Sequence, residues 1–332
     1  MKKILTLCLS LVMTMSLIGC SKENKAVAVV NEKDITLGNY EIVLALNKSS
    51  MQSYSAGNMD WTAEIEDGKT YEDKVREIAL DSMVTSEVIY QEAEKQKLLP
   101  TDKEVQDQID SFNESIKSDE NAKKEFDAMG IDEEFLKYQF TRDLASSNLQ
   151  KNFMEKTKVS NDEMQKYYEK NKEAYYVNTV STSHILLKTQ DDQGKELSKE
   201  KQEKAKKKAE EVLVKVNAGG DFAKLAKEYS EDSSAQNGGE IQAFGKEDAI
   251  VDEYKEAAFG MKKGEVSGLV KSQFGYHIIK VTDRVEKQET FEEVKDKIKS
   301  TLVNEKYTKY VQKLEKDTKV EKKENIVKSA EF

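Results

Sequence analysis

Residues 177–188 read VNTVSTSHILLK, and this stretch separates two kinds of pattern along the chain. Polar and apolar residues alternate in it and β-branched residues are frequent, which is typical of a strand. After it, apolar residues at helical spacing cover residues 199–216, and residues 266–283 contain two more strand patterns, the second at residues 276–281. A strand, helices and further strands in so short a span predict a compact α+β domain over residues 176–284.

Residues 26–175 are mostly helical in pattern. Apolar residues recur at helical spacing over residues 71–97, and Pro100 ends that helix ahead of a capping box. Residues 49–70 hold Ser, Gly and Asn and break the spacing, so they are predicted as a loop that Trp61 packs against the rest of the domain.

One amphipathic helix follows the α+β domain. It begins at a capping box on Thr290 and runs to about Lys316. A single amphipathic helix gains most of its stability by docking its apolar face. We therefore expect residues 285–332 to complete the helical domain of residues 26–175, with the α+β domain inserted between its two parts.

The N-terminus is typical of a secretory signal peptide. Two lysines precede an uncharged apolar run over residues 4–18. The run is shorter than the roughly 20 apolar residues of a membrane-spanning helix. Residues 1–19 are therefore predicted as a removable signal peptide, and residues 20–25 as a polar tether.

The residues Leu17-Ile18-Gly19-Cys20 resemble the lipobox of bacterial lipoproteins. The resemblance implies a lipid on Cys20 that holds the chain on the extracytoplasmic side of the cell membrane. Each buried methylene contributes about 0.8 kcal/mol, so several acyl chains give stable anchoring. The alternative is an ordinary secreted protein in which this cysteine occurs by chance. Cys8 lies in the removable segment, so a chain lipidated on Cys20 would contain no disulfide.

The composition excludes several classes of partner. Charged residues make up 35% of the chain and the formal net charge is −10, which becomes −12 once Lys2 and Lys3 are removed. This acidic balance argues against binding to nucleic acid or to anionic lipid. The only arginines are Arg76, Arg142 and Arg284. A site for phosphorylated peptides would need clustered guanidinium groups, so phosphate specificity is not expected.

The chain has two histidines, His184 and His277, and both lie in predicted strands of the α+β domain. His184 shares a strand face with Thr182 and Leu186. In an antiparallel sheet the two rings could lie side by side, each setting the tautomer of the other. A structural role for the pair is the alternative. Carboxylates at the spacing of a metal site do not accompany them, so no metal is expected.

The α+β domain resembles the parvulin family of prolyl isomerases. Six motifs carry the resemblance in order: His184-Ile185-Leu186, residues 222–234 (FAKLAKEYSEDSS), Gly238-Gly239-Glu240, Glu256-Ala257-Ala258-Phe259, Gly264-Glu265-Val266-Ser267 and residues 274–279 (FGYHII). With its lipobox and flanking helices, the whole chain resembles the PrsA foldase lipoproteins and the SurA chaperone. This resemblance implies a parvulin-like antiparallel sheet inserted in a mostly helical chaperone domain.

The same resemblance implies roles for individual residues. His184 and His277 match the paired histidines of the family, Asp232 matches a position that is Cys or Asp, and Ser272 matches a hydroxyl residue of the same hydrogen-bond network. The apolar floor of the proline pocket would comprise Ile241, Ile250, Tyr254 and Phe274. Core packing is the alternative role for Ile241, Ile250 and Tyr254.

Two departures from the family pattern affect the expected site. The family sequence Gly-Gly-Asp-Leu-Gly is replaced by Gly238-Gly239-Glu240-Ile241-Gln242. The resemblance therefore does not determine the course of the backbone after the glycine pair. The pocket Met and Phe of the family are replaced by Ile250 and Tyr254.

The resemblance implies a peptidyl-prolyl cis–trans isomerase of EC 5.2.1.8 that needs no cofactor. Its expected partners are unfolded or partly folded exported proteins, and two copies can pair in this family. The alternative is a chaperone that binds clients through the same fold with little isomerase activity. A solute-binding lipoprotein would have two α/β lobes with parallel sheets, and the long helical segments argue against it.

Overall fold

The computed structural model describes residues 25–332 apart from residues 56 and 58. The predicted signal peptide, Cys20 and all of the predicted tether except Lys25 lie outside the described residues. The chain divides into two compact units. Unit 1 is Met1–Val159 with Ser300–Phe332, and unit 2 is Ser160–Lys299. Helix α10 (Phe291–Asp317) begins in unit 2 and ends in unit 1.

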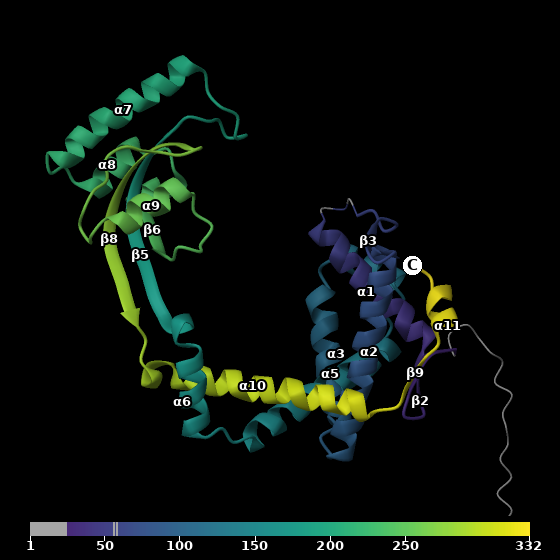
Figure 1. Cartoon of the computed structure of the whole chain (residues 1–332). Coiled ribbons are helices and arrows are strands. Elements are labelled where there is room, and N and C mark those ends of the chain that lie inside the picture. The colour runs from purple at the N-terminus through teal and green to yellow at the C-terminus, as the bar shows by residue number, and fades with distance from the viewer. Residues whose placement is uncertain (1–24, 56, 58) are drawn as a thin grey trace, which may run out of the picture. The chain divides into compact units, whose positions relative to one another are not determined.

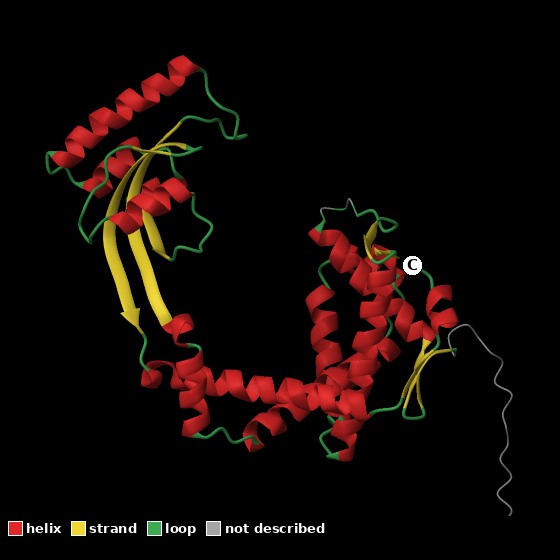
Figure 2. Cartoon of the chain, in the orientation of Figure 1, coloured by secondary structure: helices red, strands yellow, loops and turns green. Residues whose placement is uncertain are grey.

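Unit 1 is mostly helical (Figures 1 and 2). Besides the end of α10, its helices are α1 (Leu37–Tyr54), α2 (Tyr71–Lys95), α3 (Asp102–Ile116), α4 (Glu120–Ala128), α5 (Glu133–Lys156) and α11 (Glu324–Ser329). Capping boxes fix the start of two of them, at Thr70 for α2 and at Thr101 for α3. Each box satisfies backbone N–H groups that the first helical turn leaves without partners.

Short strands join distant parts of the sequence in unit 1. Strand β1 (Ala26–Val30) pairs antiparallel with β2 (Lys33–Thr36) on one side and with β9 (Val320–Lys322) on the other. A separate hairpin is formed by β3 (Glu64–Glu66) and β4 (Lys69–Thr70). The pairing of β1 with β9 brings residues from both parts of the sequence into one core.

The main core of unit 1 lies between this sheet and helices α1 and α2. Its largest fully buried side chain is Tyr40, whose hydroxyl donates to the backbone oxygen of Arg76 at 3.0 Å. The guanidinium of Arg76 in turn donates to the carbonyls of Val327 and Ala330, which holds the α11 segment on the core. Trp61 packs edge-on against Phe332, with ring centroids 5.3 Å apart.

Unit 2 is built on an antiparallel sheet with the strand order β6-β5-β8-β7. The strands are β5 (Tyr176–Lys188), β6 (Glu240–Phe244), β7 (Val270–Lys271) and β8 (Gly275–Gln288). Besides the start of α10, the helices of unit 2 are α6 (Asn161–Lys170), α7 (Lys199–Asn217), α8 (Phe222–Tyr229) and α9 (Asp252–Gly260). Unit 2 also contains the 3₁₀ turns η2 (Lys172–Tyr175) and η3 (Ser233–Asn237). The long pair β5–β8 forms the centre of this sheet.

Alternation along the two central strands divides the sheet into two faces. On one face Ile185, Leu187 and Ile278 pack against α7 and α8. On the other face Val180 and Ile279 pack with residues of α9. The register opposes His184 to Ile279 and Leu186 to His277, so both histidines lie on the α9 face.

The α+β class predicted from the sequence is confirmed, and the sheet is antiparallel throughout. The prediction of a loop over residues 49–70 is wrong in part, because α1 runs to Tyr54 and β3 and β4 form a hairpin there. In unit 2, residues 233–245 contain the turn η3 and the edge strand β6. Strand β6 is short, and Phe244 is its only buried residue, so its sequence lacks a clear period of two. The prediction that residues 177–188 form a strand is confirmed by β5.

Unit 2 extends beyond residues 176–284. Tyr168 of α6 stacks on Tyr175 with ring centroids 5.6 Å apart, and its hydroxyl donates to the backbone oxygen of Glu289 at 2.6 Å. These contacts attach α6 to the base of the strands β5 and β8.

Candidate active site

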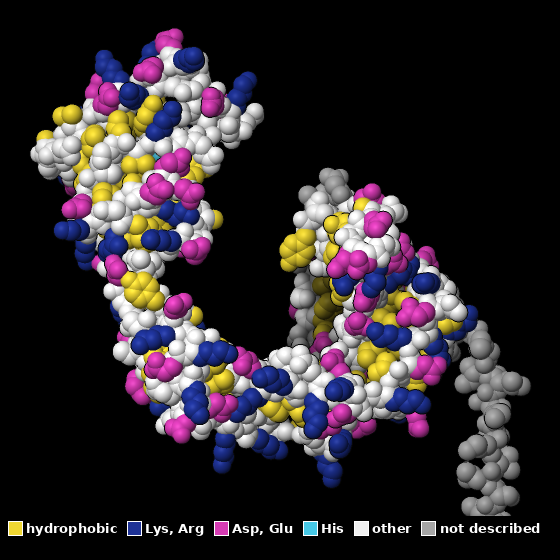
Figure 3. Space-filling view, in the orientation of Figure 1, with side chains coloured by type: hydrophobic (Ala, Val, Ile, Leu, Met, Phe, Trp, Pro, Cys, Tyr) yellow, Lys and Arg dark blue, Asp and Glu magenta, His cyan; other side chains and the backbone are white. Residues whose placement is uncertain are grey.

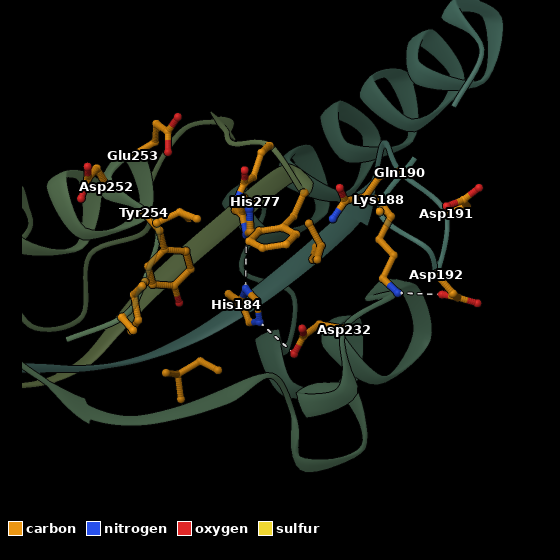
Figure 4. Close-up of a pocket in the computed structure, with 18 residues that line it drawn as sticks. His184, Lys188, Gln190, Asp191, Asp192, Asp232, Asp252, Glu253, Tyr254 and His277 are labelled. Atoms are coloured by element: carbon orange, nitrogen blue, oxygen red, sulfur yellow. Dashed lines mark hydrogen bonds and ion pairs between the residues drawn. The ribbon is translucent and has the colours of Figure 1, made fainter. Parts of the chain in front are cut away.

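Four side chains on the α9 face of the sheet form a continuous polar chain. The hydroxyl of Ser272 lies 2.7 Å from Nε2 of His277. Nδ1 of His277 lies 3.4 Å from Nδ1 of His184, and Nε2 of His184 lies 3.2 Å from Oδ1 of Asp232. Figure 4 shows His277, His184 and Asp232 along this path. All four predicted polar residues therefore contact one another in sequence.

The backbone between α8 and η3 holds Asp232 beside His184. Ser230 accepts a hydrogen bond from the N–H of Leu186 at 3.1 Å, and the N–H of Glu231 donates to the Leu186 carbonyl at 2.8 Å. This segment therefore runs alongside β5 and delivers Asp232 to the histidine pair. Oδ1 of Asp232 also accepts from the N–H and the hydroxyl of Ser234, which fixes its orientation.

The glycine pair Gly238-Gly239 supports His184 from the other side. Gly239 has φ +79°, and its carbonyl accepts from the N–H of His184 at 2.8 Å. A Cβ atom on Gly239 would lie 2.1 Å from the His184 carbonyl oxygen. Only glycine permits this close approach of the η3 turn to β5.

Burial controls the charge of the histidine pair. Desolvation, and to a smaller extent the neighbouring His184, lower the pKa of His277 to about 4. Desolvation also lowers the pKa of His184, although Asp232 acts in the opposite direction. Both rings are therefore neutral at neutral pH.

Asp232 keeps its negative charge. Partial burial raises the pKa of this carboxyl, but hydrogen bonds from Ser234 and the contact with His184 outweigh that effect and lower the pKa to about 2. The Nε2 atom of His184 lies within ion-pair distance of Asp232 but lacks the alignment of a hydrogen bond. We regard their interaction as mainly electrostatic.

One set of tautomers satisfies the whole chain of contacts. If Nε2 of His184 carries its proton towards the carboxylate, Nδ1 of His184 accepts from Nδ1–H of His277. Nε2 of His277 then accepts the hydroxyl proton of Ser272, whose oxygen accepts from the N–H of Phe274 at 3.1 Å. The O–H of Ser272, the Nδ1–H of His277 and the Nε2–H of His184 then all point towards Asp232. The proton positions are assigned from the contacts between these groups.

A cavity of about 1090 Å³ opens over this polar chain. His184, His277 and Asp232 line it, whereas Ser272 lies behind His277. The predicted apolar residues Ile241, Ile250, Tyr254 and Phe274 also line it. The structure therefore brings all the residues predicted for the site into or directly beside one cavity.

Tyr254 has a contact that the sequence did not reveal. Its hydroxyl lies 2.7 Å from the hydroxyl of Thr182, and both groups are buried. Its ring stands edge-on to His184 and His277, with both centroid distances at 5.5 Å. Burial raises the pKa of this phenol, so it stays protonated. Thr182 shares the strand face of His184, and this alternation is the signal that could have identified it.

No metal site accompanies this cavity. Within residues 25–332, leaving out 56 and 58, no group of three or more His, Cys, Asp or Glu side chains could hold a metal ion. In the same described part of the chain, no helix has both the length and the apolar character needed to cross a bilayer.

Comparison with known proteins gives consistent matches along the whole chain. Residues 163–285 match the family model of the PPIC-type PPIase domain, and residues 1–150 match that of the SurA-like N-terminal domain. The chain is 33% identical over 339 residues to the foldase protein PrsA of Caldanaerobacter subterraneus subsp. tengcongensis, with 98% of each chain covered. It is 30% identical over 346 residues to the foldase protein PrsA of Clostridium tetani, covering 97% of this chain and 96% of that protein.

Solved structures of the same kind are also similar. The crystal structure of the peptidylprolyl isomerase PrsA from Bacillus anthracis is 25% identical in sequence and has a TM-score of 0.30. The match covers 71% of this chain and 94% of that one.

Proposed function

The chain belongs to the PrsA foldase family, and on this basis we propose that it assists the folding of exported proteins while anchored by a lipid on Cys20. Its PPIC-type domain makes it a parvulin-type peptidyl-prolyl cis–trans isomerase. We assign this activity to the cavity over the polar side chains Ser272, His277, His184 and Asp232. The observation that carries the assignment is that these four side chains contact one another in a row beneath an apolar-lined cavity.

The reaction rotates a bond without breaking one. Rotation about an X–Pro bond faces a barrier of about 18–20 kcal/mol, because the twisted amide loses its resonance. Uncatalysed exchange takes tens of seconds or longer, which is slow enough to limit folding. A catalyst must therefore stabilise the twisted amide more than the planar one.

The charge of Asp232 suits this task. Resonance in the planar amide places negative charge on the carbonyl oxygen, and twisting removes part of that charge. A carboxylate near the oxygen therefore destabilises the planar form relative to the twisted form. The lowered pKa of Asp232 keeps that charge in place at neutral pH. We do not assign Asp232 as a nucleophile, because no covalent bond changes.

The neutral histidines serve the same end. A protonated imidazole beside the carbonyl oxygen would stabilise the planar, more polar amide and raise the barrier. Burial of His184 and His277 prevents that protonation. The apolar side chains Ile241, Ile250 and Phe274 would hold the proline ring and exclude water from the carbonyl.

The isomerase assignment is tested with a short Ala-Pro peptide and the full chain. Magnetisation-exchange NMR measures the cis–trans exchange rate with and without the protein. We expect exchange well above the uncatalysed rate at micromolar protein. Suppression of client aggregation without faster exchange would instead support the alternative, a chaperone that binds clients through an inactive isomerase fold.

The anchor is a separate part of the proposal. The lipobox residues and the PrsA relatives support a lipid on Cys20 and an extracytoplasmic location. Expression of the full chain and of Cys20→Ser in a bacterium tests this directly. We expect the wild-type chain in the membrane fraction and the variant in the soluble extracytoplasmic fraction. Retention of the variant in the membrane would refute the lipid anchor.

We also propose that the helical unit binds unfolded or partly folded clients and that two copies can pair. Both ideas come from the family. Sedimentation of the purified chain over a range of concentrations measures the pairing.

A further inference from the structure

Acidic side chains surround the candidate active site. Asp191 and Asp192 lie on the loop that follows β5, and Asp252 and Glu253 lie in the first turn of α9. Figure 4 shows these two pairs on opposite sides of the histidines. Together with Asp232 they place five carboxylates on the wall of the cavity, where Lys188 is the only lysine or arginine.

This charge is local to the cavity. In the view of Figure 3, Lys and Arg side chains alternate with Asp and Glu side chains over the surface of unit 2. A mixed surface of that kind produces little net field, because opposite charges cancel within a Debye length of about 8–10 Å. A concave wall with one dominant sign concentrates the potential on whatever occupies the cavity.

The ion pairs of these carboxylates leave them available to a ligand. Lys188 lies 3.3 Å from Asp192, whose side chain is 97% exposed, and Lys255 lies 3.3 Å from Asp252, whose side chain is 86% exposed. Exposed ion pairs of this kind contribute little to stability, so a bound cation can replace them. The side chain of Glu253 is exposed as well.

The ligand of this cavity follows from the proposed function, on which this inference rests. A peptide whose proline ring contacts Ile241, Ile250 and Phe274 continues in both directions along the cavity. Each residue of an extended chain spans about 3.3–3.6 Å, so the residues that flank the proline lie within reach of the acidic walls.

We propose that this site selects X–Pro segments whose proline is flanked by lysine or arginine, and that it discriminates against flanking carboxylates and phosphates. Asp191, Asp192, Asp252 and Glu253 are the specificity-determining residues. The selection is electrostatic, so it mainly raises the association rate of basic peptides, and it weakens as the salt concentration rises.

Three matched peptides test the proposal with the full chain. Their central sequences are Lys-Pro-Lys, Ala-Pro-Ala and Glu-Pro-Glu, and magnetisation-exchange NMR gives kcat/KM for each. We expect the lysine peptide to exceed the glutamate peptide by about tenfold at about 0.05 M salt, and this ratio to approach one at about 0.5 M. A ratio of one at low salt, or faster exchange of the glutamate peptide, would overturn the proposal.

The alanine peptide separates this proposal from the proposed function. If none of the three peptides exchanges faster with protein, the isomerase assignment fails. If the alanine peptide is accelerated but the charged peptides do not differ from it, only the selectivity is wrong.

Variants locate the selectivity. Asp191→Asn with Asp192→Asn, and Asp252→Asn with Glu253→Gln, each remove two charges from one side of the cavity. Asparagine retains the side-chain oxygen with which Asp191 accepts from the N–H groups of Gln193 and Lys195. We expect each double variant to lower the ratio of kcat/KM for the lysine peptide to kcat/KM for the glutamate peptide. All four changes together should bring this ratio near one.

A matched control changes the same charge elsewhere in unit 2. Glu210→Gln with Glu211→Gln removes two exposed carboxylates from α7, outside the cavity. We expect this control to keep the wild-type ratio. An unchanged ratio in the four-residue variant, or an equal loss in the α7 control, would show that the cavity carboxylates do not select the peptide.

Discussion

The Nδ1 atoms of His184 and His277 lie 3.4 Å apart on neighbouring strands, and both side chains are buried. Two neutral imidazoles can meet in this way only if one nitrogen donates and the other accepts. Each ring therefore fixes the tautomer of the other, and Asp232 and Ser272 determine the direction in which the protons point. Loss of one ring must disturb the whole chain of contacts.

Replacement of His277 by alanine should therefore reduce isomerase activity. We expect His277→Ala to lower kcat/KM for the Ala-Pro peptide at least about tenfold, which corresponds to about 1.4 kcal/mol of transition-state stabilisation. The change leaves unit 1 intact, so suppression of client aggregation should persist. Far-UV circular dichroism checks the fold of the variant. Wild-type exchange rates in a folded His277→Ala chain would show that the pair has only a structural role.

The histidine pair also predicts how stability depends on pH. The unfolded chain takes up a proton on His277 at the ordinary pKa of 6.5, whereas the folded chain does so only near about 4. Between these values the unfolded state binds more protons, so the free energy of unfolding falls as the pH falls. The contribution is complete above pH 6.5 and is lost towards pH 4, at a cost of up to about 3 kcal/mol.

The measurement is a urea titration of the full chain at about pH 7.5 and about pH 4.5, followed by the NMR signals of β8. His277→Asn should reduce the difference between the two midpoints, because it removes the titrating group. Asp232 does not interfere with this comparison. Its carboxyl has a pKa of 3.8 in the unfolded chain and about 2 in the folded chain, so its effect on stability falls mainly below pH 4. Equal pH dependence in His277→Asn and the wild type would contradict the assignment.

The sequence predicted the elements that depend on local pattern. Strand β5 is confirmed over the stretch whose alternation suggested it, and the capping boxes at Thr101 and Thr290 are present. The side-by-side placement of His184 and His277 also follows from strand alternation, because both residues could be assigned to a face before their strands were paired.

The parts that the sequence could not predict depend on contacts between distant residues. Strand β9 has three residues and exists because it pairs with β1, nearly three hundred positions earlier. The packing role predicted for Trp61 is confirmed, but its partner Phe332 could not be inferred from any local pattern. Asp232 reaches His184 only through backbone contacts with Leu186, and it was identified from the family resemblance alone.

The buried pair Thr182–Tyr254 should stabilise unit 2. Tyr254→Phe removes one hydroxyl and leaves that of Thr182, which is fully buried, without its partner. An unsatisfied buried hydroxyl costs about 1–3 kcal/mol, so we expect a loss of that size in the free energy of unfolding.

Adding Thr182→Val to Tyr254→Phe should recover much of that loss, because the orphaned hydroxyl is then absent. Urea titration of the two single variants and the double variant, followed by the NMR signals of β5, gives the coupling energy. Additive effects of the two changes would mean that the hydroxyls do not interact.

Gly239 should tolerate no side chain. A comparison with a second glycine separates the steric cost at this position from the general effect of replacing glycine by alanine. Its φ of +79° disfavours L-residues, and an added Cβ would lie 2.1 Å from the carbonyl oxygen of His184. Gly239→Ala must therefore push the η3 turn away from β5, and Asp232 moves with that turn. We expect a loss of about 3 kcal/mol or more in the free energy of unfolding, together with loss of isomerase activity.

Gly260 provides the matched control, because a Cβ atom there would meet no atom within 4 Å and it ends helix α9. Gly260→Ala should be neutral or slightly stabilising, since alanine restricts the unfolded chain more than glycine does. Urea titration of both variants and the Ala-Pro exchange rate measure the contrast. If Gly239→Ala folds as stably as Gly260→Ala and keeps its activity, the close contact between η3 and β5 does not hold the site together.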